Sequence, residues 1–260
     1  MEITNKVIVV TGGAGGIGLA IAKEFIKEGP KIVILVDISF KNFNFKNKKI
    51  LCEQCDVTNE LNIQNLIDKI NINFGLIDIF CSNAGIGGAF GLLDVTTDDW
   101  QTIWDVNFMA HTHAAKHLIP QMLDQGSGYL VNTASAAGLL TQIGAAPYSV
   151  TKAAAVSLAE WIKITYGEKG IGVSCLCPQA VKTAMTAQGP GVAGVDGMIE
   201  ADECAQDVID AIKKERFLVT PHKEVLEYIK RKTTDYDRWI TGMQRLQGRF
   251  EEFYEDFKDQ

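Results

Sequence analysis

The sequence lacks the features that would place a protein in a membrane or on nucleic acid. No apolar run among its 260 residues approaches the ~20 residues that a transmembrane helix needs. The start, MEITNKVIVVTGG, shows no basic segment followed by a long apolar one, as a secretory signal would. Cations are also in deficit, since 25 Lys and Arg stand against 32 Asp and Glu for a net charge of −7. We therefore expect a cytoplasmic protein with no membrane or nucleic-acid partner.

Cysteine is present but poorly arranged for a metal or a disulfide. Cys52 and Cys55 form a CxxC pair, and Cys175 and Cys177 form a CxC pair, so a zinc site is one interpretation. Both pairs fall in strand-like runs. Side-chain alternation there sends Cys52 and Cys55 to opposite faces but Cys175 and Cys177 to the same face. We expect buried, reduced thiols and no metal site.

Three histidines lie close together in HTHAAKH. His113 and His117 are four residues apart, which is a spacing found in metal sites on helices. The sequence offers no carboxylate or cysteine at a suitable spacing to complete such a site. We expect these histidines on a helix surface or at a subunit interface.

Short apolar runs alternate with amphipathic segments of helical length. Strands are expected over 6–10, 31–36, 49–52, 77–81, 129–133, 171–176 and 216–220, and helices over about 16–29, 59–74, 98–124, 148–168 and 202–215. The strand runs are near-continuously apolar, as in strands covered on both faces. This alternation predicts a doubly wound α/β fold with a parallel sheet. The basic segment 39–49 and the glycine-rich segment 187–197 are expected to be loops, the second without any strand or helix pattern.

A glycine-rich turn follows the first predicted strand. In VIVVTGGAGGIGLAIAKEF, Gly12, Gly16 and Gly18 stand between a strand and a helix, where glycines let a pyrophosphate approach the backbone and the helix N-terminus faces the anion. Asp37 ends the next strand, nineteen residues after Gly18. A carboxylate there accepts hydrogen bonds from the adenosine ribose and repels a 2′-phosphate. The pattern favours NAD over NADP, although a lysine of the 39–49 loop could fold back toward the site.

A tyrosine and a lysine are four residues apart in APYSVTKAA. Tyr148 and Lys152 would share one face of a helix. A free tyrosine is a poor base at pH 7, and an ammonium beside it would lower its pKa. The pair alone does not distinguish a tuned catalytic base from an ordinary helix-surface pair.

Taken together, the motifs resemble the short-chain dehydrogenase/reductase superfamily in its one-domain branch. The resemblance is carried in order by TGGAGGIG, CDV at 55–57, NAG at 83–85, Asn107, Ser135 and YSVTK, and it spans about residues 3–220. It implies a Rossmann-type fold with a mainly parallel seven-stranded sheet and hydride transfer to or from nicotinamide. It also implies a homodimer or homotetramer, paired through the helices that carry Asn107 and Tyr148.

The resemblance implies two sets of site residues. The catalytic set is Asn107, Ser135, Tyr148 and Lys152. The cofactor-binding set is Gly12, Gly16, Ile17, Gly18, Asp37, Asp56, Val57, Asn83, Ala84, Gly85, Tyr148, Lys152, Pro178 and Thr183.

Each role follows from a matched position. Asp56 and Val57 match residues that contact adenine, Asn107 matches a residue that holds a water leading to the lysine, and Thr183 matches one that binds the nicotinamide carboxamide. One position departs from the family: Gln179 follows Pro178 where the family usually has glycine. Gln179 either accepts ordinary backbone angles or reshapes the nicotinamide pocket.

The segments around the catalytic set suggest an apolar substrate. The apolar residues are Ala136, Ala137, Leu139, Leu140 and Ile143 before Tyr148, and Met185 and Met198 beside the glycine-rich loop. No basic residue except Lys182 stands where a carboxylate or phosphate would need one. This composition favours a hydrophobic secondary alcohol or ketone.

Residues 223–260 are expected to be a helical extension of a catalytic domain over 1–222. An apolar stripe at helical spacing supports a helix; it consists of Trp239, Met243, Leu246, Phe250, Phe253 and Phe257. Gly242 and Gly248 weaken that prediction. The helix would pack on its own subunit, cover the active-site mouth or reach a neighbouring subunit.

We therefore expect an NAD-dependent enzyme acting on CH–OH or C=O groups with Tyr148 as general acid/base. Alternatives are an NADPH-dependent 3-oxoacyl-thioester ketoreductase, disfavoured by Asp37 and by the lack of a basic patch, and a non-catalytic dinucleotide-binding regulator, disfavoured by the intact catalytic set. A nucleotide-sugar epimerase would need a longer substrate portion.

Overall fold

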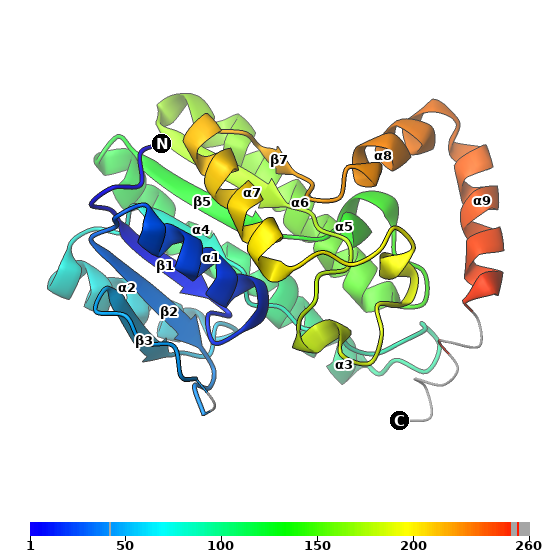
Figure 1. Ribbon diagram of the computed structural model, residues 1–260, viewed down its shortest axis with the longest axis horizontal. Helices are drawn as coiled ribbons and strands as arrows, with labels where there is room; N and C mark the ends of the chain where they lie inside the picture. Colours follow the sequence, from blue (N-terminus) through cyan, green and yellow to red (C-terminus); the bar gives the residue numbers. More distant parts are fainter. Residues whose placement is uncertain (42, 251–253, 255–260) are drawn as a thin grey trace.

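Seven parallel strands form one sheet at the centre of the molecule (Figure 1). The computed structural model describes residues 1–41, 43–250 and 254. The strands are β1 (Val7–Thr11), β2 (Ile32–Asp37), β3 (Ile50–Gln54), β4 (Ile79–Ser82), β5 (Gly128–Thr133), β6 (Ile171–Leu176) and β7 (Leu218–Val219). Their order is β3-β2-β1-β4-β5-β6-β7. The doubly wound Rossmann-type fold is confirmed, with every expected strand in place.

Helices cover both faces of this sheet (Figure 1). One face carries α1 (Gly16–Lys27) and α7 (Ala201–Lys214). The other carries α2 (Glu60–Phe74), α4 (Ala110–Asp124) and α6 (Ala146–Tyr166). Alternate side chains of each inner strand enter the two cores, which explains why the strand runs are apolar throughout.

The strand order reverses between β1 and β4. These two parallel strands are neighbours in the sheet although β2 and β3 separate them in sequence. Loops after two such strands diverge at the carboxyl edge of the sheet and leave a crevice there. The topology therefore brings the glycine-rich turn after β1 beside the NAG segment after β4.

The helix expected over 98–124 is continuous but changes its winding. It consists of α3 (Thr97–Trp104), a π-helical turn over Asp105–Met109 and α4. Such π turns are often found at functional sites. This one contains Asn107, whose side chain is completely buried.

The glycine-rich segment 187–197 differs from the prediction, because a 3-10 turn forms over Gly191–Gly194. A second one, over Ala184–Thr186, precedes it. Val192 packs with Ile143 and Tyr254, and this long-range contact could not be read from the local pattern.

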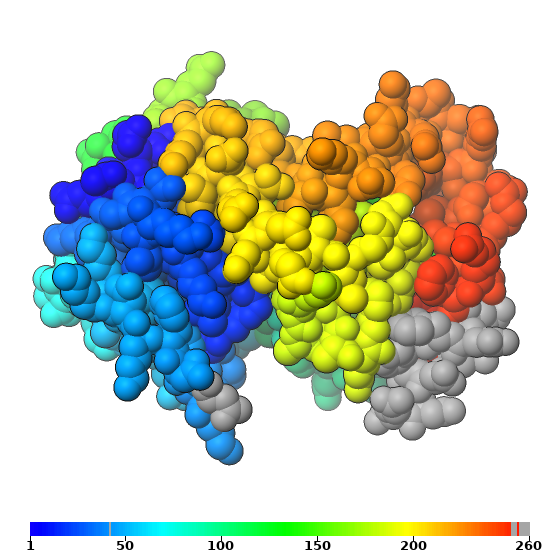
Figure 2. Space-filling model, in the orientation of Figure 1, coloured from blue at the N-terminus to red at the C-terminus, as the bar shows by residue number. Residues whose placement is uncertain are grey.

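Two helices follow β7 and form a lobe at one end of the molecule (Figures 1 and 2). They are α8 (Glu224–Thr234) and α9 (Tyr236–Arg249). The helix α8 packs on the short helix α5 (Ala136–Leu140), and its Val225 is completely buried there.

The predicted apolar stripe lies on α9 and packs on the same chain. Trp239 packs beside Val225, whereas Met243, Leu246 and Phe250 pack against the cluster of Ile143, Val192 and Tyr254. The remaining two stripe residues, Phe253 and Phe257, lie outside the described residues. Within the described chain, no helix combines the length and the hydropathy needed to cross a bilayer.

Candidate active site

The glycine-rich turn between β1 and α1 has the geometry of an anion cradle. Gly12 and Gly16 have φ of 64° and 52°, which glycine adopts without strain. A side chain at Gly18 would place its Cβ 2.2 Å from the carbonyl oxygen of Gly12. No side chain caps the N-terminus of α1, and no acidic residue lies in its first turn. The first N–H groups of α1 therefore remain available to a pyrophosphate, while Ile17 packs against the core.

Asp37 lies beside this cradle. Its Oδ2 accepts a hydrogen bond from the Ala14 backbone N–H at 3.0 Å, so the carboxylate stands where a ribose would leave the turn. Lys49 donates to the carbonyl oxygen of Pro30 at 2.7 Å, before the start of β2. Lys49 therefore does not stand beside Asp37, where it could favour a 2′-phosphate.

Asp56 and Val57 follow β3 at the same edge of the sheet. The Thr58 hydroxyl donates to Asp56 Oδ1 at 2.7 Å, which tightens this turn. The Val57 side chain is buried in the core shared with α2, so its backbone is the part that faces the crevice.

The NAG segment ties three strands together. The backbone N–H groups of Asn83 and Ala84 donate to Thr11 Oγ1 at 2.9 and 3.0 Å. The Asn83 amide donates to the Thr11 carbonyl at 3.1 Å and accepts from the Thr133 hydroxyl at 3.1 Å. A Cβ on Gly85 would lie 3.3 Å from Lys152 Nζ. Glycine at this position lets the ammonium approach the loop closely.

Asn107 holds the next stretch of the same loop. Its Oδ1 accepts from the Ile86 N–H at 2.8 Å, and its Nδ2 donates to the Ile86 carbonyl at 3.0 Å. A weaker contact of 3.4 Å joins Nδ2 to Thr151 Oγ1 on α6. In this structure Asn107 therefore fixes the loop after β4 against the helix that carries the tyrosine and the lysine.

Ser135, Tyr148 and Lys152 come together near the carboxyl ends of β5 and β6. Ser135 caps α5, because its Oγ accepts from the Ala137 N–H at 3.1 Å. Tyr148 lies in the first turn of α6 and Lys152 one turn later. Lys152 Nζ donates to the Thr133 carbonyl at 3.0 Å and lies 5.7 Å from the centre of the Tyr148 ring. The predicted i,i+4 pair therefore faces the serine and not the solvent.

Burial dominates the ionisation of this group. Removal from water raises the pKa of Tyr148, and the Ser135 side chain acts in the opposite direction. Burial lowers the pKa of Lys152 to about 8. The net shift of the Tyr148 pKa is therefore upward, opposite to the expected direction, because desolvation of the phenolate is its largest cause.

The loop after β6 connects the serine to the cradle. The Pro178 carbonyl accepts from the Ala136 N–H at 2.9 Å, and the methyl group of Thr183 would lie 3.3 Å from a Cβ on Gly16. The φ angle of Gln179 is not positive, so this position does not require glycine. Its Nε2 donates to Asp196 Oδ2 at 2.9 Å. The backbone of Gln179 is therefore unstrained, and its side chain lines the cavity that also contains Ser135.

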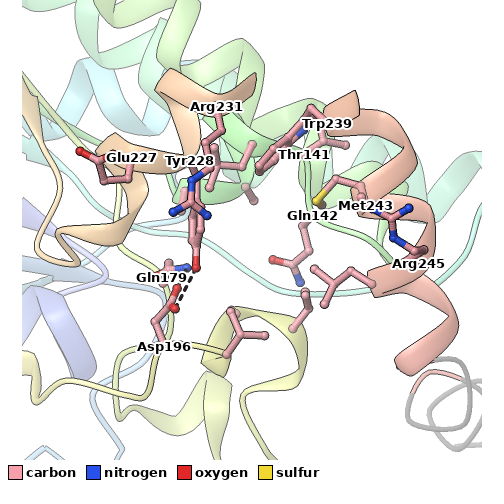
Figure 3. A pocket seen from close by; sticks show the side chains of 18 of the residues that line it. Thr141, Gln142, Gln179, Asp196, Glu227, Tyr228, Arg231, Trp239, Met243 and Arg245 are labelled. Atoms are coloured by element: carbon pink, nitrogen blue, oxygen red, sulfur yellow. Dashed lines mark hydrogen bonds between the residues drawn. The ribbon is translucent and has the colours of Figure 1, made fainter. Parts of the chain in front are cut away.

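A cavity of about 910 Å³ opens from Ser135 toward the C-terminal lobe (Figure 3). Its apolar wall includes Ala136, Ala137, Leu140, Val192, Trp239, Met243 and Leu246. The C-terminal helices contribute the opposite wall. Five cationic residues also line it: Lys230, Arg231, Arg238, Arg245 and Arg249.

The arginines correct the expectation that only Lys182 could meet an anionic substrate. Lys182 instead pairs with Glu200, whereas the arginines reach the cavity because α8 and α9 fold back over α5. A signal for them existed in the sequence, since Arg238 and Arg245 are two helical turns apart on the predicted tail helix.

Two of the three histidines of α4 are buried and do not lie on an exposed helix surface. His111 is 2% exposed and His113 is 8% exposed. Both ring nitrogens of His111 are buried without a hydrogen-bond partner, and burial lowers its pKa to about 3. His117 Nε2 lies 3.0 Å from Glu60 Oε1, which also accepts from Lys116 at 2.7 Å. The sequence did not predict that Glu60 would contact these histidines, because α2 places it against α4 only in the folded chain.

The cysteines follow the predicted alternation of faces, but one of them is not buried. Cys175 and Cys177 are buried on the same face with their sulfurs 3.7 Å apart, and Cys55 is buried while Cys52 is exposed. The prediction of a buried thiol at Cys52 is wrong, because β3 is the edge strand. All six cysteines are free. Among the described residues, no group of three or more His, Cys, Asp or Glu is placed to hold a metal.

Comparison with known proteins gives one consistent result. The family described as short chain dehydrogenase matches residues 6–190. The chain is 32% identical over 231 residues to 1-deoxy-11-beta-hydroxypentalenate dehydrogenase of Streptomyces avermitilis, which covers 84% of this chain and 85% of that protein. It is 32% identical over 191 residues to meso-2,3-butanediol dehydrogenase of Serratia marcescens, covering 72% and 75%. A short chain dehydrogenase/reductase from Burkholderia phymatum, solved in complex with NAD, superposes with a TM-score of 0.82 at 26% identity, covering 91% and 96%.

Proposed function

This chain belongs to the short-chain dehydrogenase family, and we propose that it is an NAD-dependent oxidoreductase interconverting a secondary alcohol and a ketone. The observation that carries the proposal is the convergence of Ser135, Tyr148 and Lys152 at the sheet edge that also holds the glycine cradle. The two dehydrogenases that match over most of their length are named for hydroxylated compounds, which supports a CH–OH substrate.

The cofactor-binding residues would be those of the crevice. The N-terminus of α1 and the turn from Gly12 to Gly18 would hold a pyrophosphate. Asp37, fixed by Ala14 N–H, would accept hydrogen bonds from a ribose and disfavour a 2′-phosphate. Thr183, packed against Gly16, would face the nicotinamide end. When bound, the dinucleotide accepts a hydride from the alcohol carbon or returns it to the ketone.

Residues of the protein would transfer the proton. In its ionised form Tyr148 takes the hydroxyl proton of the alcohol, and in its neutral form it donates a proton to the ketone oxygen. Ser135 donates a hydrogen bond to the same oxygen and stabilises its developing negative charge. Lys152, held by the Thr133 carbonyl, offsets the charge on Tyr148 in its ionised form. Asn107 holds the loop that closes over Lys152.

Two further parts of the proposal concern the oligomeric state and the cellular compartment. The helix α6 exposes Val150, Trp161 and Ile164 by 48%, 56% and 83%, and these positions share one helical face. Such a face supports a homodimer or homotetramer assembled through α6. Six free cysteines suit the reducing cytoplasm.

The test is an initial-rate survey of aliphatic, cyclic and aromatic secondary alcohols with NAD and with NADP. We expect turnover with NAD and little with NADP. Tyr148→Phe should lower kcat/KM by about two to four orders of magnitude while NAD affinity is retained. Tyr166→Phe, at the other end of α6, is the matched control and should leave the rate unchanged. Near-normal turnover in Tyr148→Phe would remove the tyrosine as acid/base, and a preference for NADP would remove Asp37 as the selector.

A further inference from the structure

The cavity beside Ser135 has two chemically different ends. Ser135, Ala136 and Ala137 form the end next to the catalytic group. The other end is built by α8 and α9 (Figure 3), which lie beyond the region that defines the family match at residues 6–190. A substrate long enough to fill the 910 Å³ cavity would therefore present its reacting carbon to Ser135 and its remainder to helices that lie beyond the matched family region.

The far end is cationic although the protein as a whole is acidic. Five cationic and three anionic side chains line the cavity, in a chain of net charge −7. None of the ion pairs found among residues 1–41, 43–250 and 254 involves one of the four arginines. Within the described part of the chain these guanidinium groups form no ion pair, and the cavity lining carries more cationic than anionic side chains.

Two of the three acidic side chains that line the cavity accept hydrogen bonds from neutral groups. Asp196 accepts from Tyr228 Oη at 2.9 Å and from Gln179 Nε2 at 2.9 Å. Asp235 caps α9 by accepting from the Arg238 N–H at 3.0 Å. Glu227, on α8, is the third. Asp196 and Asp235 are thus held by neutral donors and not by the guanidinium groups of the cavity.

Two arginines are placed on facing walls (Figure 3). The Arg231 guanidinium lies 5.5 Å from the centre of the Tyr228 ring, and this stacking orients it. Tyr228 is itself anchored by Asp196. Arg245 lies on the cavity side of α9 near Met243 and Gln142 (Figure 3). A planar guanidinium binds carboxylate and phosphate oxygens in a bidentate manner.

We propose that the substrate of this enzyme is an apolar secondary alcohol or ketone that carries an anionic group, a carboxylate or a phosphate, bound by the cationic side chains that α8 and α9 contribute to the cavity, Arg231 and Arg245 among them. This inference rests on the proposed function and names its substrate class. Trp239, Met243 and Leu246 contact the apolar body between the two ends. The extension after residue 222 therefore selects the substrate, while the preceding domain performs the reaction.

The test measures binding, so it does not depend on finding the natural substrate. Octanoate, octyl phosphate and octanol are titrated into the protein saturated with NADH, with calorimetry as the readout. We expect either anion to bind more tightly than octanol. Arg231→Gln or Arg245→Gln should weaken anion binding by about tenfold, as for a lost charge-assisted hydrogen bond, and leave octanol binding unchanged. Raising the ionic strength should weaken only the anions.

Arg216→Gln is the matched control, because Arg216 precedes β7 away from the cavity and its side chain contacts the Asp207 carbonyl. It removes the same charge and should leave all three affinities unchanged. A preference for octanoate over octyl phosphate, or the reverse, identifies the anion. Equal binding of octanol and both anions, or equal losses in Arg216→Gln and Arg245→Gln, would overturn the inference.

Failure of this inference is distinguishable from failure of the proposed function. Oxidation of neutral secondary alcohols with no anion preference leaves the proposed function in place and removes the anionic substrate class. Selective anion binding in a protein that oxidises no alcohol or hydroxy acid would retain the binding site and remove the proposed reaction. A 3-oxoacyl-thioester reduced with NADPH, and not with NADH, would favour the ketoreductase alternative and contradict the role of Asp37.

Discussion

Replacing Lys152 by methionine should make the cofactor-free protein more stable while abolishing turnover. The Lys152 side chain is 3% exposed, and its hydrogen bond goes to a neutral group, the Thr133 carbonyl. Burying an ammonium without a carboxylate partner destabilises the folded state. Methionine has a similar length and no charge to desolvate, so the folded protein avoids that cost.

The size of the effect follows from the pKa of the lysine. Burial lowers it from 10.5 to about 8, which corresponds to about 3 kcal/mol of destabilisation when the group is protonated in both states. Methionine also loses the hydrogen bond to Thr133, worth about 1 kcal/mol. At pH 7 we therefore expect Lys152→Met to be about 2 kcal/mol more stable, with a melting temperature higher by roughly 4–8 °C.

The pH dependence has a definite sign. Below about pH 8 both the folded and the unfolded chain bind the Lys152 proton, and the full cost of burial is present. Between about pH 8 and pH 10.5 the unfolded chain keeps that proton and the folded chain releases it, so wild-type stability rises with pH. Tyr148 and Cys175, both near Lys152, have raised pKa values and stay neutral through most of this window.

Urea unfolding at a series of pH values, with wild type and Lys152→Met compared at each, measures the difference directly. Lys46→Met, at an exposed position of the 39–49 loop, is the control for loss of a surface lysine. We expect the variant's advantage to shrink from pH 8 upward, to disappear before about pH 10, and to reverse above about pH 10.5, where the neutral wild-type lysine costs nothing and keeps its hydrogen bond to Thr133. A wild type that is the more stable protein at pH 7, or a difference that does not change with pH, would refute the reasoning.

Two other substitutions follow from contacts in the crevice. Gly18→Ala would place Cβ 2.2 Å from the Gly12 carbonyl oxygen, so calorimetry should show loss of NAD binding and a lower melting temperature; Gly15→Ala, with no atom within 4 Å of its Cβ, should bind NAD nearly as well as wild type, and equal behaviour of the two would contradict the cradle. Asn107→Ala removes both hydrogen bonds to Ile86 and should cost about 2 kcal/mol in urea unfolding and raise KM for NAD; an unchanged unfolding midpoint would mean that the loop after β4 is held elsewhere.

The tail helix illustrates how far sequence patterns reach. The spacing of Trp239, Met243 and Leu246 predicted a helix with one apolar stripe, and α9 has it. The same pattern could not tell which surface the stripe would cover, because helical periodicity carries no information about a distant partner. The pattern therefore did not place the arginines beside that stripe at the cavity next to Ser135.

The histidine segment shows the same limit for charged groups. The sequence predicted a helix over His111, His113 and His117, and α4 is that helix. Burial of His111 and the approach of Glu60 from α2 depend on how two helices separated by a strand pack on one face of the sheet. Such contacts join residues far apart in the chain, and neither motif nor spacing reports them.

The sequence alone determined the seven strands, the glycine turn and the shared helix of Tyr148 and Lys152, because each of these depends on local backbone preference or on spacing within one element. Ser135 was assigned only through the resemblance to the family. Only the tertiary structure decided the environment in which those groups act. Burial sets the direction of the pKa shifts of Tyr148 and Lys152, and the fold of α8 and α9 brings Arg231 and Arg245 to the cavity. Desolvation and long-range contacts are properties of the packed chain, and no motif or spacing in the sequence reports them.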